Sequence, residues 1–254
     1  LLGPYAGFLT MIGVLLIQCL FFADGGLLAL GCNVWNMAFY GCFIGALIWK
    51  LVTKKGYSKR RIAVASVLGC VLTLQMGAFS VTLETLASGV TELPFGVFVA
   101  TMQPIHLAIG AVEGLITAAV LVFIYEARPE LLYGKNVAVS ADGKLSFRKT
   151  LVVLALAAVV IGGGLSLVAS EYPDGLEWSM EQVAGTAELQ ADGEAYEAAA
   201  AVQDATAVLP DYAFQSSDTA AGTVVSGIVG SVIVVAVCVG ACYAFRFFRR
   251  KQTA

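Results

Sequence analysis

The chain has 254 residues, of which 59% are hydrophobic and 13% charged, and its net charge is −3. A water-soluble domain carries about twice that charged fraction, and one core of this size cannot bury so much apolar surface. The composition therefore excludes an ordinary soluble domain and indicates that much of the chain lies in lipid.

Six segments are long and apolar enough to cross a bilayer, which takes about 20 residues of helix. Helices are expected because these runs do not alternate as membrane strands do, and a helix satisfies its own backbone hydrogen bonds in lipid. In chain order the segments are residues 5–23, 27–52, 62–83, 95–125, 151–169 and 223–245. We expect an all-α membrane protein with six transmembrane helices, a four-helix block followed by a two-helix hairpin.

The basic residues predict the orientation. All 15 Lys and Arg lie in or beside three places: the connection between the second and third segments, that between the fourth and fifth, and the end of the sixth. With six alternating spans these places share one side of the membrane, which the positive-inside rule makes cytoplasmic. We therefore expect a cytoplasmic C-terminus and an outer loop at residues 171–222, where 11 acidic residues lie between 171 and 218.

Turn signals divide the chain into two expected domains. Residues 1–133 form the four-span block, 134–150 a polar cytoplasmic linker, and 151–254 the hairpin with its outer loop. The Ala-rich middle of that loop, residues 194–208, fits either a marginal helix or disorder.

Ionisable side chains at membrane depth are candidate site residues, because they are costly in lipid and usually face the bundle interior. His106 and Glu113 are seven residues apart, so a helix projects them from one face. Pro104 is expected to kink this helix. The pair fits an element of transport or coupling, and it equally fits hydrogen bonds that hold the bundle together.

Three oxygen-bearing side chains lie near one end of the first two segments: Asp24, Asn33 and Asn36. Such oxygens can ligate hard or borderline cations. The same residues also suit a turn and a helix start, and both interpretations stay open.

The outer loop opens with a short motif: Pro173, Asp174, Gly175, Leu176 and Glu177. Asp174 and Glu177 have the spacing of a helix capping box, and a functional role is an equal alternative. The signatures of nucleotide hydrolases and metalloproteases are absent from the sequence. We therefore expect no enzyme and no catalytic residue, and uphill transport would draw its energy from another subunit.

Two parts of the chain resemble components of metal importers. Residues 1–132 resemble the C-terminal two-thirds of the substrate-specific membrane subunit of energy-coupling-factor cobalt and nickel ABC transporters (CbiM/NikM type). Residues 151–246 are similar to the accessory unit of the nickel systems, whose hallmark Pro-Asp-Gly-Leu-Glu stands at 173–177. The whole resembles a fused, NikMN-like subunit. The first resemblance is carried by Leu-Gly-Pro-Tyr-Ala-Gly-Phe at 2–8, the run from Gln18 to Asn36, Pro-Ile-His at 104–106 and Ile-Gly-Ala-Val-Glu-Gly at 109–114.

The resemblance implies capture of Ni²⁺ or Co²⁺ at the outer side of the bacterial cytoplasmic membrane. A transmembrane coupling subunit and cytoplasmic ATPases would be the partners, in a lipid bilayer and without nucleic acid. The family holds its metal with the N-terminal amine, a His at position two and a second His before the Leu-Gly-Pro segment. None of these is present, so we assign no metal ligand and expect that an N-terminal part is missing.

Five residues match motifs of the resembled family, and the resemblance implies that they are supporting or pathway residues: Asp24, Asn33, Asn36, His106 and Glu113. The transported ion, Ni²⁺ or Co²⁺, is the expected cargo, and no resident cofactor is expected. The alternative function is a membrane scaffold or assembly factor that docks partner proteins through the acidic outer loop.

Overall fold

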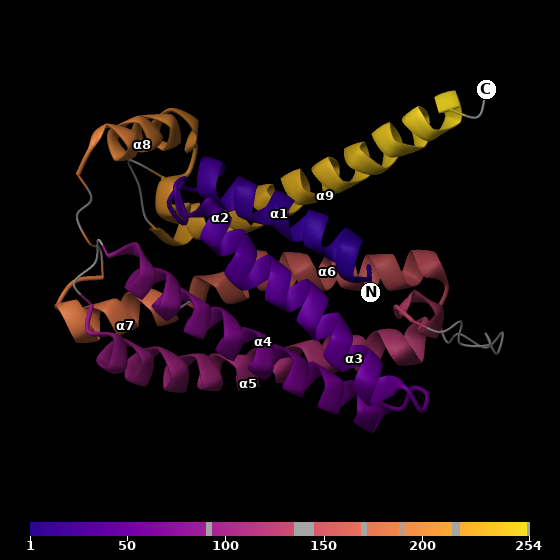
Figure 1. Cartoon of the computed structure of the whole chain (residues 1–254). Helices are drawn as coiled ribbons and strands as arrows, with labels where there is room; N and C mark the ends of the chain where they lie inside the picture. The colour runs from indigo at the N-terminus through magenta and orange to yellow at the C-terminus, as the bar shows by residue number, and fades with distance from the viewer. Residues whose placement is uncertain are drawn as a thin grey trace. The chain divides into compact units, whose positions relative to one another are not determined.

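The computed structural model describes residues 1–89, 93–134, 145–168, 172–187, 189, 192–214 and 219–252. Every regular element in these ranges is helical, so the all-α prediction is confirmed for them (Figure 1). The expected linker falls largely on residues 135–144, which lie outside the described ranges. The elements are α1 (Pro4–Phe21), α2 (Leu30–Asn33), the π-helix η1 (Val34–Ile44), α3 (Gly45–Thr53), α4 (Lys59–Ser88), α5 (Phe95–Ala127), the 3₁₀-helix η2 (Pro129–Leu131), α6 (Phe147–Gly163), the 3₁₀-helix η3 (Leu165–Val168), α7 (Gly175–Ala184), α8 (Glu194–Thr206), the 3₁₀-helix η4 (Pro210–Tyr212) and α9 (Thr219–Gln252).

Five helical stretches are long and apolar enough to cross a membrane, and each matches an expected segment. They are Pro4–Phe21, Leu30–Thr53, Lys59–Ser88, Phe95–Ala127 and Ala221–Gly240. The remaining expected segment, 151–169, is α6 followed by η3, and α6 with 17 residues is not one of the five. The described residues thus contain five candidate membrane-crossing helices, while the count of six remains a prediction.

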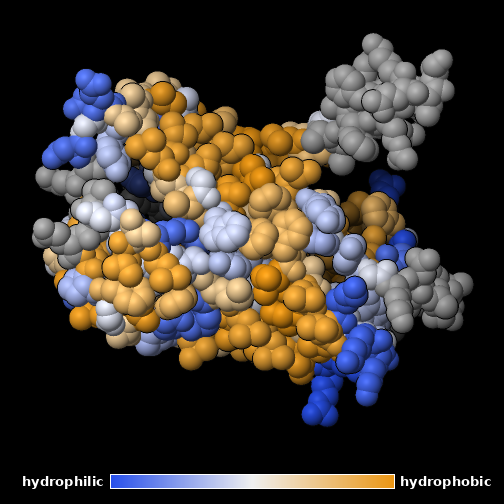
Figure 2. Space-filling model, in the orientation of Figure 1, coloured by the Kyte–Doolittle hydropathy of each residue, from blue (hydrophilic) through white to orange (hydrophobic). Residues whose placement is uncertain are grey.

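Most side chains of these stretches face outward, as lipid exposure requires. Only 11% to 33% of each apolar window is buried within the chain. Figure 2 shows apolar side chains over the visible faces of α4 and α5, and hydrophilic ones at the end where α3 turns into α4. Lys54, Lys55 and Lys59 are exposed at this turn, which is where the positive-inside rule expects cytoplasmic charge.

The chain divides into two compact units that interleave along the sequence. The first comprises Leu1–Leu9, Gly31–Val153 and Ser170–Ala191, and the second comprises Thr10–Leu30, Leu154–Ala169 and Asp192–Ala254. Each unit therefore takes part of the expected four-span block and part of the expected outer loop.

In the first unit, α4 and α5 lie side by side and form the most extensive helix pair (Figure 1). Gln75 and Gln103 tie them together, because each side-chain amide donates to the other residue's carbonyl, at 2.8 and 3.3 Å. α5 continues through Pro104 as one helix.

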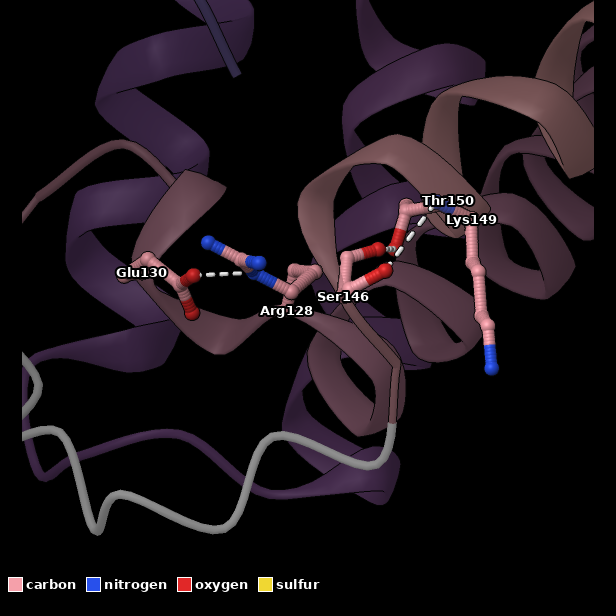
Figure 3. Close-up of polar contacts among 5 residues, drawn as sticks. All are labelled: Arg128, Glu130, Ser146, Lys149 and Thr150. Carbon is pink, nitrogen blue, oxygen red and sulfur yellow. Dashed lines mark hydrogen bonds and ion pairs between the residues drawn. The ribbon is translucent and has the colours of Figure 1, made fainter.

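The start of α6 is fixed by local polar contacts in the same unit (Figure 3). The Ser146 hydroxyl accepts from the Lys149 backbone N–H at 3.4 Å, and the Ser146 carbonyl accepts from that of Thr150 at 3.0 Å. The Arg128 guanidinium lies 5.6 Å from the Phe147 ring centroid, a cation–π contact from the end of α5. These contacts hold the first turn of α6 near the end of α5.

In the second unit, α6 and α9 approach closely through two glycines. A Cβ on Gly227 would lie 2.9 Å from the carbonyl oxygen of Gly162. Small residues permit such backbone contact between helices in lipid. The same unit contains a buried apolar cluster of Ile17, Phe22 and Leu209.

Candidate functional site

The loop between α1 and α2, residues 22–29, contains Asp24 and turns on left-handed backbone. Ala23 has φ 54° and Gly25 has φ 77°. Glycine adopts such angles at no steric cost, whereas alanine in this region is strained. Contacts from elsewhere in the chain must therefore hold the α1–α2 loop in this shape.

Two side chains hold Asp24. The Gln18 amide donates to Asp24 Oδ2 at 3.1 Å, and the Tyr212 hydroxyl donates to the same oxygen. The Tyr212 ring stacks on Phe22, with centroids 4.8 Å apart. Burial raises the pKa of Tyr212, and the hydrogen bond to Asp24 raises it further, so the phenol keeps its proton even at alkaline pH values where a free tyrosine ionises.

Gln203 on α8 makes three hydrogen bonds to the backbone around the α1–α2 loop. Its oxygen accepts from the Leu27 N–H at 3.0 Å, and its nitrogen donates to the carbonyls of Gly25 at 3.1 Å and Cys19 at 3.2 Å. Backbone N–H groups that follow α8 also donate to the Phe21 carbonyl. The second part of the outer loop thus satisfies backbone groups that the end of α1 leaves open.

In the first unit, Asn36 projects from η1 toward α4. Its Nδ2 donates to Glu84 Oε2 at 2.8 Å, while its Oδ1 is buried and meets no donor among the described residues. One turn further along, the hydroxyls of Tyr40 and Ser80 share a hydrogen bond of 2.8 Å. Asn33 stands at the start of η1, and its side chain makes no capping hydrogen bond there.

His106 and Glu113 differ in their surroundings. His106 is half-buried, and its Nδ1 pairs with the Met102 carbonyl of its own helix at 2.8 Å. Glu113 is exposed and lies about 10 Å further along the helix axis. The structure therefore does not bring the two into one polar cluster, and their functional role remains a prediction.

The motif at 173–177 begins α7 and lies against α5. Asp174 accepts hydrogen bonds from the backbone N–H groups of Leu176 and Glu177, both at 2.8 Å, which confirms its capping role. A Cβ on Gly175 would lie 3.0 Å from His106 Cε1, so glycine permits this close approach. Three residues of α7, Leu176, Met180 and Val183, pack against the cluster of Ala78, Phe98 and Met102.

Replacing Asp174 with Ala is expected to weaken α7 by about 1 kcal/mol, because two backbone N–H groups lose their cap. Amide hydrogen exchange of α7 in the purified protein should then be several-fold faster. Asp174→Asn keeps an acceptor oxygen and should exchange nearly as the parent does. Equal exchange in Asp174→Ala and the parent would contradict the capping role.

No group of three or more His, Cys, Asp or Glu side chains that could hold a metal ion occurs within the described part of the chain.

Three residues that form the polar contacts described above were not among the candidates from the sequence: Glu84, Gln203 and Tyr212. Glu84 stands one residue beyond the expected end of its segment, and its charge beside a long apolar run was the available signal. For Gln203 and Tyr212 the sequence offers no such signal, because their hydrogen-bond partners lie more than 175 positions away along the chain.

Comparison with known families gives two matches. Residues 1–131 match the family described as the cobalt uptake substrate-specific transmembrane region, and residues 148–247 match the PDGLE domain.

Several curated proteins are similar over most of this chain. A protein of Archaeoglobus fulgidus named as a fused nickel transport protein, NikMN, is 36% identical over 93% of this chain and 71% of its own length. The cobalt transport protein CbiM of Geobacter sulfurreducens is 32% identical over 72% of this chain and 55% of its own length. The fused nickel transport protein NikMN of Rhodobacter capsulatus is 31% identical over 71% of this chain and 55% of its own length. No solved structure matches the chain.

Proposed function

This chain belongs to the cobalt uptake substrate-specific transmembrane family, joined in one polypeptide to a PDGLE domain, and we propose that it captures Ni²⁺ or Co²⁺ for an energy-coupling-factor importer. The names of its relatives, which describe nickel and cobalt transport proteins, support a metal ion as the cargo. The Pro-Asp-Gly-Leu-Glu motif favours nickel.

In the proposed topology the chain crosses the bacterial cytoplasmic membrane six times, with its C-terminus in the cytoplasm. α6 has 17 residues and extends about 25 Å, and the four residues of η3 add about 8 Å. Together they approximate the ~30 Å hydrocarbon core. With α6 as a span, all 15 Lys and Arg lie on the cytoplasmic side.

One observation carries the proposed role of the accessory region. Gln203 and Tyr212, both from the outer loop, hydrogen-bond the α1–α2 loop that contains Asp24. We propose that this contact keeps the loop in the shape that admits the cation, which explains why an accessory region is joined to the capture subunit. Asp24, Asn33, Asn36, His106 and Glu113 are proposed to support the cation's path, and Pro173, Asp174, Gly175, Leu176 and Glu177 to position α7.

The energy for import is proposed to come from partners. The sequence contains no nucleotide-binding signature, so this chain would act with a transmembrane coupling subunit and cytoplasmic ATPases. The chain itself would bind the ion and not catalyse a reaction.

Uptake of radioactive Ni²⁺ and Co²⁺ tests the proposal. Cells that express the gene encoding this chain together with its coupling and ATPase partners should accumulate at least one of the ions several-fold faster than cells with the partners alone. The same partners should co-purify with the chain. Uptake at the background rate for both ions, with co-purification of unrelated proteins through the outer loop, would favour a scaffold function instead.

A further inference from the structure

Glu84 is a carboxylate within a candidate membrane span, and within the described residues it forms no ion pair with a basic side chain. It lies four residues before the end of α4, whereas Lys59 at the start of the same helix is about 37 Å away. The ion pairs among the described residues, Lys59–Glu126 and Arg128–Glu130, do not include it. A carboxylate in this setting attracts a cation or a proton, because an isolated charge is costly in lipid.

Asn36 places an oxygen without a hydrogen-bond donor beside Glu84. The residue is only 8% exposed, and its side chain points at Glu84, with 2.8 Å between Nδ2 and Oε2. Its Oδ1 is buried and receives no hydrogen bond from the described chain. Buried amide oxygens are nearly always paired, so an unpaired one next to a carboxylate is a place for a bound water or a cation.

Cys32 supplies a third donor atom at the same place. It precedes Asn36 by four residues in the continuous helical stretch Leu30–Thr53, so both side chains can lie on the face toward α4. Cys32 interacts electrostatically with Glu84, and its thiol is exposed, whereas Asn36 is buried. Polar side chains therefore follow one another along the contact between this stretch and α4. They begin with the accessible Cys32 thiol and the Glu84 carboxylate, continue with the buried Asn36 amide and end at the Tyr40–Ser80 pair.

The backbone here also departs from the ordinary helix. η1 is a π-helix of 11 residues that includes Asn36. Such stretches are rare and frequently mark functional sites, because their wider winding redirects side chains. Gly77 of α4 permits η1 to approach closely, since a Cβ there would lie 2.6 Å from the Asn36 carbonyl oxygen.

We propose that Cys32, Asn36 and Glu84 form a transient binding site for a divalent transition-metal cation. The inference deepens the proposed function and rests on it for the direction of transport. The ligands are the Glu84 carboxylate, the Asn36 amide oxygen and the Cys32 sulfur, and a sulfur ligand favours Ni²⁺, Co²⁺ or Zn²⁺ over Mg²⁺ and Ca²⁺.

Binding requires two local changes. The Asn36 carboxamide rotates so that its oxygen replaces Nδ2 toward Glu84, which turns a donor–acceptor pair into two acceptors around the cation. The Cys32 thiol releases its proton to solvent as the thiolate coordinates the metal. Without a cation, the Asn36–Glu84 hydrogen bond closes the site.

Co²⁺ binding to the purified 254-residue chain in detergent tests this site, because a thiolate ligand gives cobalt an intense near-ultraviolet charge-transfer band. The parent should show this band on addition of Co²⁺ alone. Cys32→Ser should lose the band, and Glu84→Gln should weaken the apparent Kd at least tenfold. Cys42→Ser and Glu181→Gln, which remove a thiol and a carboxylate elsewhere, should leave band and Kd unchanged.

The variants are nearly isosteric, and size-exclusion profiles equal to the parent's establish that they fold. A band that persists in Cys32→Ser, or a Kd in Glu84→Gln equal to the parent's, would overturn the site even if cells take up the metal. Conversely, the band and its loss in Cys32→Ser would support the site even if uptake stays at the background rate. The spectroscopic and uptake results therefore separate this inference from the proposed function.

Discussion

Replacing Gly77 with Ala is expected to destabilise the first unit by about 3 kcal/mol, the upper end of the cost of overpacking. The new Cβ would lie 2.6 Å from the backbone oxygen of Asn36, and backbone cannot move aside as a side-chain end can. η1 must therefore shift away from α4, and this shift also separates Asn36 from Glu84.

A matched control lies on the same helix. A Cβ on Gly69 would meet no atom within 4 Å, so Gly69→Ala should stabilise α4 by about 1 kcal/mol through helix propensity. Thermal unfolding in detergent should show a midpoint lower by about 5 °C or more for Gly77→Ala and unchanged or higher for Gly69→Ala. Similar midpoints for the two variants would show that η1 and α4 are not in close contact.

Replacing Gln203 with Leu is expected to reduce metal uptake at least tenfold. The change removes three hydrogen bonds of about 1 kcal/mol each and leaves the Leu27 N–H and two carbonyls without their side-chain partner. Because 1.4 kcal/mol corresponds to a factor of ten in an equilibrium, the α1–α2 loop should leave this conformation at least tenfold more often than in the parent.

Two measurements test this prediction. Metal uptake in cells reports transport, and hydrogen exchange of residues 22–29 in the purified protein reports the conformation of the α1–α2 loop. Gln182→Leu makes the same chemical change at an exposed position of α7 and should alter neither. Tyr212→Phe removes the bonds that the hydroxyl makes with Asp24 and Gln18, leaves the backbone bonds of Gln203 in place, and should have a smaller effect than Gln203→Leu. Faster exchange without reduced uptake would show that the loop's shape does not control transport.

The sequence by itself determined the helical class and the position of most spans. An apolar run of about 20 residues is stable in lipid as a helix, because a helix satisfies its own backbone hydrogen bonds. The helices α1, α4 and α5 therefore begin and end within a few residues of the expected limits. The capping role of Asp174 was also readable, because a cap depends on residues two and three positions away. Residues 194–208 fitted helix or disorder, and the structure shows the helix α8.

Only the tertiary structure decided which polar residues meet. Asn36 and Glu84 are 48 positions apart, and Gln203 is 176 positions from Leu27. No local pattern encodes such pairs, because they depend on how the helices pack. The π-helical winding of η1 was equally hidden, since a run of apolar residues satisfies α- and π-helix alike. Composition and periodicity report where residues partition between water and lipid, whereas the contacts that shape the candidate site arise from packing between distant segments.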